Sequence, residues 1–85
     1  MDKRVAVISI IVENEGMTGQ INDILHEYRE HIIGRMGIPY REKGISIISV
    51  AIDAPQDVIS AMSGRIGRLS GITAKTAYSN VITKA

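Results

Sequence analysis

The chain of 85 residues contains no cysteine, no phenylalanine and no tryptophan, and each absence excludes a class of structure. Without cysteine there are no disulfides, no thiolate zinc site and no cysteine-ligated iron–sulfur cluster. Because three tyrosines are the only aromatic residues, the core must be aliphatic. The longest apolar run, at 5–12, is too short to cross a bilayer and lacks the flanks of a signal peptide. We therefore expect a cytoplasmic protein with no membrane partner.

Length and composition indicate one small folded domain over residues 1–85. Hydrophobic residues make up 45% and charged residues 22% of the chain, which is the balance of a globular domain. In a chain of this length we expect no separate DNA-reading or catalytic module. The net charge of +1 argues against binding nucleic acid through bulk charge.

The charges are nevertheless unevenly placed along the chain. No Asp or Glu follows Asp57, whereas four cations do, namely Arg65, Arg68, Lys75 and Lys84. This basic strip has two interpretations: a solvated surface with cations near a helix C-terminus, or a set of contacts to a partner or to DNA phosphates. The candidate partner or DNA contacts are Arg35, Arg65, Arg68 and Lys75.

Hydrophobic periodicity predicts four strands. Apolar, β-branched residues predict buried strands over 4–12 and 45–52, and alternation predicts two further strands over 32–40 and 72–79. Pro39 places the second strand at an edge of the sheet or at a strand end. One predicted face of that strand carries Ile32, Met36, Ile38 and Tyr40.

Two stretches with helical period separate these strands. The first, over 18–31, has an apolar stripe, and Thr18 is its predicted N-cap. The second, over 54–67, follows a capping-box-like signature in which Asp53 stands three residues before Gln56.

The resulting order, β-α-β-β-α-β, predicts an α+β fold of the ferredoxin-like type. This fold is a two-layer sandwich in which one antiparallel four-stranded sheet carries both helices on one face. The motif Gly-Arg-apolar-Gly occurs once in each half, as GRMG at 34–37 and GRIG at 64–67. Such loops can bind phosphates. Because each motif follows a helix, we interpret both as hinges and helix stops that use glycine at positive φ and display Arg35 and Arg65 outward.

Several functional sites that are common in ferredoxin-like folds need residues that this sequence does not have at the required positions. An RNA-recognition site would need aromatic residues on the inner strands, and these strands have none. The nucleic-acid clamp of KH domains has its Gly-x-x-Gly loop between two helices, whereas GRIG leads into a strand. The acylphosphatase motif lies between the first strand and the first helix, whereas GRMG lies on the second strand. His26 and His31 project about 140° apart on a helix, so a metal held by His26 with Glu30 would need ligands from another subunit. No nucleophile–base arrangement is present. We expect no enzymatic activity, no cofactor and no metal site.

Both inner strands are apolar on both faces, although the helices of this fold cover only one face. In the first strand the second apolar face consists of Val5, Val7 and Ile11, and in the third it consists of Ile45, Ile47 and Ala51. An uncovered aliphatic face favours aggregation, and its simplest cover is another copy of the chain. We therefore expect a homo-oligomer, dimer or tetramer, whose interface contains Val7, Ile11, Ile45 and Ile47.

Three stretches, VISIIVE, GRMGIPYREKGISIISVAIDA and GRIGRLSGITAKTAYS, resemble the family of small iron-only hydrogenase system regulators over nearly the whole chain. That family is similar in turn to the C-terminal effector-binding domain of nickel-responsive regulators and, more loosely, to ACT domains. The resemblance implies a ferredoxin-like oligomeric domain linked to the maturation or expression of iron-only hydrogenase. These 85 residues match neither the DNA-reading ribbon-helix-helix of the nickel regulators nor their cysteine and histidine set, so we do not expect DNA reading of that kind or nickel binding.

The similarity to ACT domains also implies an effector site. In ACT domains a glycine-bearing loop between the first strand and the first helix, together with the subunit interface, often holds a small effector; a plain tight turn is the alternative. The matching positions are Asn14, Glu15, Gly16 and Gly19. We thus expect a non-catalytic regulatory domain that oligomerises and binds a small-molecule effector or a partner protein. The alternative is a transcriptional regulator that contacts DNA through Arg65 and Arg68.

Overall fold

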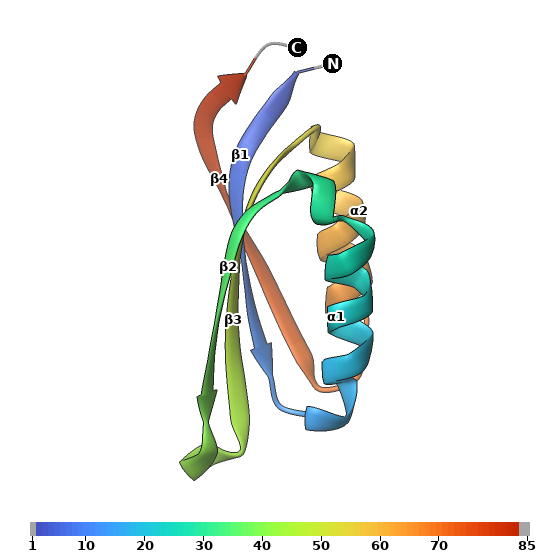
Figure 1. Ribbon diagram of the computed structural model, residues 1–85, viewed down its shortest axis with the longest axis vertical. Coiled ribbons are helices and arrows are strands. Elements are labelled where there is room, and N and C mark those ends of the chain that lie inside the picture. Colours follow the sequence, from blue (N-terminus) through green and yellow to red (C-terminus); the bar gives the residue numbers. More distant parts are fainter. Residues whose placement is uncertain (1, 84–85) are drawn as a thin grey trace.

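The computed structural model describes residues 2–83, which form one four-stranded sheet with two helices packed on one of its faces (Figure 1). The elements are, in chain order, β1 (Lys3–Val12), α1 (Thr18–Glu27), β2 (Ile32–Tyr40), β3 (Ile45–Ala54), α2 (Gln56–Gly67) and β4 (Ile72–Thr83). Short 3-10 turns at Glu15–Met17, Arg29–His31 and Arg41–Lys43 join some of them. The prediction of a ferredoxin-like α+β fold is confirmed.

The sheet has the strand order β2-β3-β1-β4, and every neighbouring pair is antiparallel. Residues opposite one another in such a pair lie on the same face of the sheet. Ile8 stands opposite Val50 on one side and Thr76 on the other, and this row faces the helices. The neighbouring position, Val7, therefore lies on the face that neither helix covers, which we call the open face.

The core lies between the sheet and the two helices, and its side chains are aliphatic apart from one methionine. Alternate residues of β1 and β3 supply the sheet side, because successive side chains of a strand point to opposite faces. The helices supply the other side through stripes at a spacing of three and four residues. Its fully buried large side chains are Ile8, Ile10, Val12, Ile21, Leu25, Val50, Ile52, Ile59, Met62 and Ile66.

Neither predicted helix cap is correct. Thr18 is the first residue of α1, and its hydroxyl donates a hydrogen bond to the Glu15 carbonyl oxygen at 2.9 Å. Asp53 lies inside β3, and its Oδ1 is buried without a hydrogen-bond partner among residues 2–83, so it does not cap α2. Pro55 occupies the N-cap position instead. In both cases the neighbouring element extends further toward the helix than the local sequence pattern indicates.

The interpretation of GRMG and GRIG as helix stops with glycine at positive φ is correct only in part: α2 does end at Gly67 of GRIG, but GRMG ends no helix and neither motif has positive φ. GRMG lies within β2 and GRIG forms the last turn of α2, and all four of their glycines have ordinary negative φ. Over residues 2–83, positive φ occurs only at Gly44 (66°) and Gly71 (74°). Gly71 turns the chain into β4, and a Cβ there would lie 2.7 Å from the Cβ of Asn14. Gly71 is thus the glycine that this turn requires.

The first helix is shorter than predicted, and one strand residue changes sides. α1 ends at Glu27, and the 3-10 turn at Arg29–His31 leads into β2. A register irregularity between Ile32 and Gly34 then places Ile32 opposite the buried Ile52. Ile32 therefore faces the helices, whereas it was expected to share a face with Met36.

Candidate functional site

The open face of the sheet carries a continuous apolar surface. Its first row crosses all four strands through Ile38, Ile47, Ile11 and Thr73. The side chains of Ile11 and Ile47 are each 41% exposed and that of Ile38 is 49% exposed. Tyr40, opposite Ile45, extends this surface toward the β2–β3 turn. Large aliphatic side chains at adjacent positions on three strands form one contiguous patch.

The next two rows of the open face contain smaller side chains, except for Met36 and Lys75 at the two edges. One runs through Met36, Ser49, Ser9 and Lys75, and the other through Gly34, Ala51, Val7 and Ala77. Lys75 lies on the edge strand β4, so the middle of the face has no charged side chain in these rows. All four predicted interface residues, Val7, Ile11, Ile45 and Ile47, lie on this face, as their spacing indicated.

The predicted effector loop between β1 and α1 is occupied by contacts within the chain. The Asn14 carboxamide oxygen accepts a hydrogen bond from the Gly16 amide at 3.0 Å, and the Glu13 amide donates to the Gly71 carbonyl oxygen at 2.8 Å. Glu15 and Gly16 are exposed, and Gly19, already inside α1, has open space around it. The structure thus brings Asn14 against Gly71, a partner that the sequence did not indicate, and the effector role of this loop stays a prediction.

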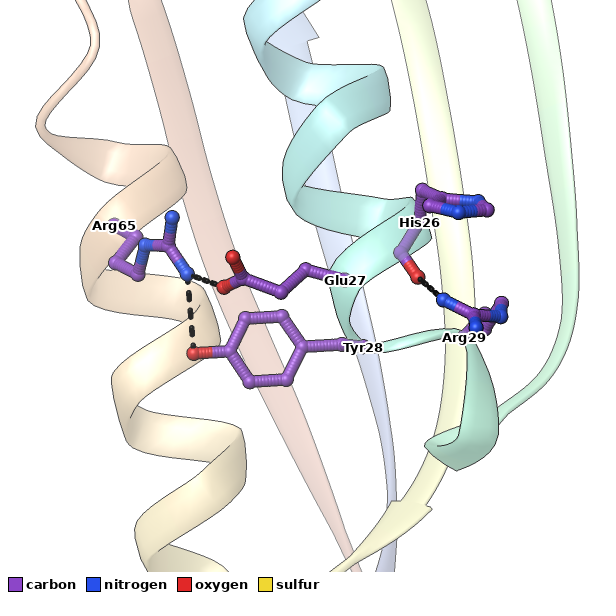
Figure 2. A network of polar contacts seen from close by, with 5 residues as sticks. All are labelled: His26, Glu27, Tyr28, Arg29 and Arg65. Atoms are coloured by element: carbon purple, nitrogen blue, oxygen red, sulfur yellow. Dashed lines mark hydrogen bonds and ion pairs between the residues drawn. The ribbon is translucent and has the colours of Figure 1, made fainter.

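Arg65 joins α2 to the end of α1 (Figure 2). Its guanidinium forms an ion pair with Glu27 and donates to the Tyr28 hydroxyl oxygen at 3.5 Å. The same group lies 5.7 Å from the centre of the Tyr28 ring, within cation–π range. The hydrogen bond with Tyr28 and then that with Glu27 raise the pKa of Arg65 above its ordinary value. Arg65 is therefore engaged within the chain and is not simply displayed outward.

The predicted basic strip is divided between two sides of the molecule. Lys75 lies on the open face, opposite Ser9, whereas Arg65 and Arg68 belong to the helix layer on the other side. Lys84 is outside the described residues. Within residues 2–83, Lys75 therefore does not share a surface with Arg65 and Arg68.

Grooves flank both helices. The groove between α1 and α2 has a volume of about 420 Å³ and is lined by Gln20, Asp23, Ile24, Arg65, Arg68 and Leu69. Two others adjoin one another between α1 and β2, and both include Asn22 and Arg35. Arg35 donates from one of its terminal nitrogens to the Asn22 side-chain oxygen at 3.0 Å. Sequence reasoning missed Asn22, because its only signal is a position on the polar side of the first helix.

Among residues 2–83, no three His, Asp or Glu side chains lie together in a way that could hold a metal ion. None of the helices there has the length and apolar character needed to cross a membrane.

Comparison with known proteins identifies the family. A family model called TM1266-like, described as a candidate iron-only hydrogenase system regulator, matches residues 4–76. The chain belongs to this family. The match includes β1 from its second residue, both helices and the GRMG and GRIG motifs, so the resemblance inferred from those stretches is confirmed.

Solved structures agree with this assignment. The uncharacterized protein TM1266 from Thermotoga maritima is 36% identical, with a TM-score of 0.86 over 89% of this chain and 96% of that chain. A formyltetrahydrofolate deformylase from Pseudomonas putida KT2440 is 16% identical, with a TM-score of 0.67 over 91% of this chain but only 29% of that one. The second likeness concerns the fold alone. No curated protein sequence matches the chain significantly.

Proposed function

We propose that this chain is a non-catalytic regulatory domain of an iron-only hydrogenase system, and that it works as a homo-oligomer which binds an effector or a partner protein. The observation that carries the proposal is the apolar open face. Ile11, Ile38 and Ile47 stand side by side on three strands and remain 41–49% exposed in the single chain. Monomeric proteins seldom expose contiguous aliphatic surface of this kind, because leaving it in water costs free energy.

A second copy of the chain is the cover that fits this face best. Two sheets pack face to face at about 10 Å, with the side chains of the two inner faces interdigitating. The large residues of the first row could pack against the small ones, such as Ser49 and Val7, in the other rows of a partner sheet. Lys75 stands at the edge, where its ammonium could stay in water while its stem covers apolar surface. Family membership supports the regulatory role.

The decisive experiment is to measure the assembly state with and without a charge on the open face. Sedimentation velocity at micromolar concentration should give a dimer or tetramer for the natural chain and a folded monomer for Ile47→Glu. A soluble monomer for the natural chain would overturn the proposal.

A further inference from the structure

The strand β2 is the edge of the sheet next to β3, and no helix buries it. Every residue of this strand after Ile32 is exposed, although its neighbour β3 contributes Ile48, Val50 and Ile52 to the core. The side of β2 that faces the helix layer therefore forms one wall of a groove, and the flank of α1 forms the other. Two adjoining hollows, of about 340 and about 170 Å³, make up this α1–β2 groove. The larger one is within the size range of small-molecule sites.

The narrower hollow has an apolar floor. Val12 and Ile48, both nearly fully buried, line it together with Pro39 and Gly37. Gly37 stands opposite Ile48, so a side chain at this position would project toward the helix layer. An added Cβ there would meet no atom within 4 Å, because it would enter the empty groove. The second glycine of GRMG thus keeps the groove open, and nothing in the fold itself requires it.

The wider hollow and its junction with the narrower one are cationic. Arg29 and Arg35 line it, together with His26, and the residues lining both hollows include no carboxylate. The acidic residues within α1 lie toward α2 instead, where Asp23 lines the other groove and Glu27 binds Arg65. Figure 2 shows His26 and Arg29 on the side of α1 turned away from Arg65. The first helix therefore separates its charges by sign between its two flanks.

The arginines of the groove are held in place but retain free donors. Asn22 accepts one hydrogen bond from Arg35, and the His26 carbonyl oxygen accepts one from Arg29 at 3.0 Å. A guanidinium has five N–H donors in a planar fork that matches the two oxygens of a carboxylate. Because Arg35 lines both hollows, an anionic group bound to it can extend an attached apolar chain into the narrower hollow, over Gly37 and Ile48.

We propose that the α1–β2 groove binds a small monocarboxylate with an apolar body, the carboxylate on Arg35 and the body over Gly37, Ile48 and Val12. Its role as the effector of a regulatory domain rests on the function proposed above, but the binding itself does not. The groove lies on the helix side of the sheet, so an oligomer formed through the open face leaves it accessible. This site accounts for GRMG by its chemistry: Arg35 provides the anion contact and Gly37 the space.

The test is a titration with hexanoate, followed by the amide NMR spectrum of the whole chain. Hexanoate should shift the amides of Asn22, Arg35, Gly37 and Ile48 in a saturable way. Acetate should bind more weakly because it lacks the apolar body, and hexylammonium should not bind at this site. Arg35→Gln should weaken hexanoate binding about tenfold or more, since it removes a charge-assisted hydrogen bond.

Two glycine variants form a matched pair. Gly37→Leu fills the groove and should abolish the hexanoate shifts, whereas Gly34→Leu adds the same side chain to open space on the opposite face of β2 and should leave them unchanged. The proposal is overturned if hexanoate shifts only open-face amides such as Ile47, if inorganic phosphate binds the groove more tightly than hexanoate, or if Gly37→Leu binds normally. Sedimentation of the same samples distinguishes this proposal from the proposed homo-oligomer. A chain that sediments as a monomer and still binds hexanoate would refute the oligomer but not the binding site.

Discussion

Ile11 of β1 lies directly opposite Ile47 of β3, and both side chains are 41% exposed on the face of the sheet that no helix covers. On the other face, the pair formed by Ile8 and Val50 is completely buried. The two pairs have almost the same hydrophobicity, so the difference in exposure comes from the helices alone. This asymmetry motivates the first prediction.

We predict that Ile47→Glu dissociates the oligomer and leaves the fold intact. A carboxylate at the centre of an apolar interface would lose its hydration without gaining a partner. Ala61→Glu is the matched control, because Ala61 is exposed on α2, away from the open face. Sedimentation velocity should show a monomer for Ile47→Glu and the natural assembly for Ala61→Glu, with similar circular dichroism spectra. Equal assembly of the two variants would contradict the prediction.

We predict that Arg65→Ala lowers the melting temperature more than Arg68→Ala does. Arg65 bridges the helices through Glu27 and Tyr28, whereas Arg68 lines the groove at the end of α2. Because the ion pair is largely exposed, the effect should be small and should decrease as salt is added. Thermal unfolding of both variants at low and high ionic strength measures this. A larger loss for Arg68→Ala would show that the bridge does not stabilise the fold.

We predict that Gly71→Ala destabilises the chain by about 1–3 kcal/mol, the usual cost of holding a non-glycine residue in the left-handed region. The new Cβ would also collide with the Cβ of Asn14, 2.7 Å away. Gly67→Ala is the control, because its Cβ would meet nothing closer than the Ala74 Cβ at 3.9 Å and alanine favours the helix. Urea unfolding should show a loss for the first variant and no loss for the second. The reverse order would refute the assignment of Gly71 as the obligatory turn residue.

We predict that any DNA binding by this chain is weak and lost with modest salt. Lys75 and Arg68 lie on opposite sides of the sheet, so few phosphates can be contacted at once. Electrophoretic mobility shifts at about 50 and about 200 mM salt would measure the effect. A discrete complex that persists at the higher salt concentration would contradict this prediction. If the double variant Arg65→Ala, Arg68→Ala then abolished that complex, the result would support the alternative of a DNA-contacting regulator.

Local pattern predicted the strands and helices well, because periods of two and of three to four residues reflect the geometry of each element by itself. The strand Ile32–Tyr40 was predicted to the residue, and the two faces of β1 and β3 were assigned correctly. The helix caps predicted at Thr18 and Asp53 were wrong. A residue at such a position either caps the helix or belongs to a neighbouring element, and which of the two it does depends on how far the preceding strand or turn continues.

The sequence by itself determined the fold class, the aliphatic core and the surplus apolar face, since these follow from composition and spacing along the chain. The tertiary structure alone decided which glycine turns the chain, which arginine is engaged and where an empty groove lies. Gly71 needs its conformation because Asn14 approaches it, and Arg65 is held because α1 presents Glu27 and Tyr28 to it. Arg35 meets Asn22 because β2 runs beside α1. Such pairings depend on distances between residues far apart in the chain, and no local periodicity encodes them.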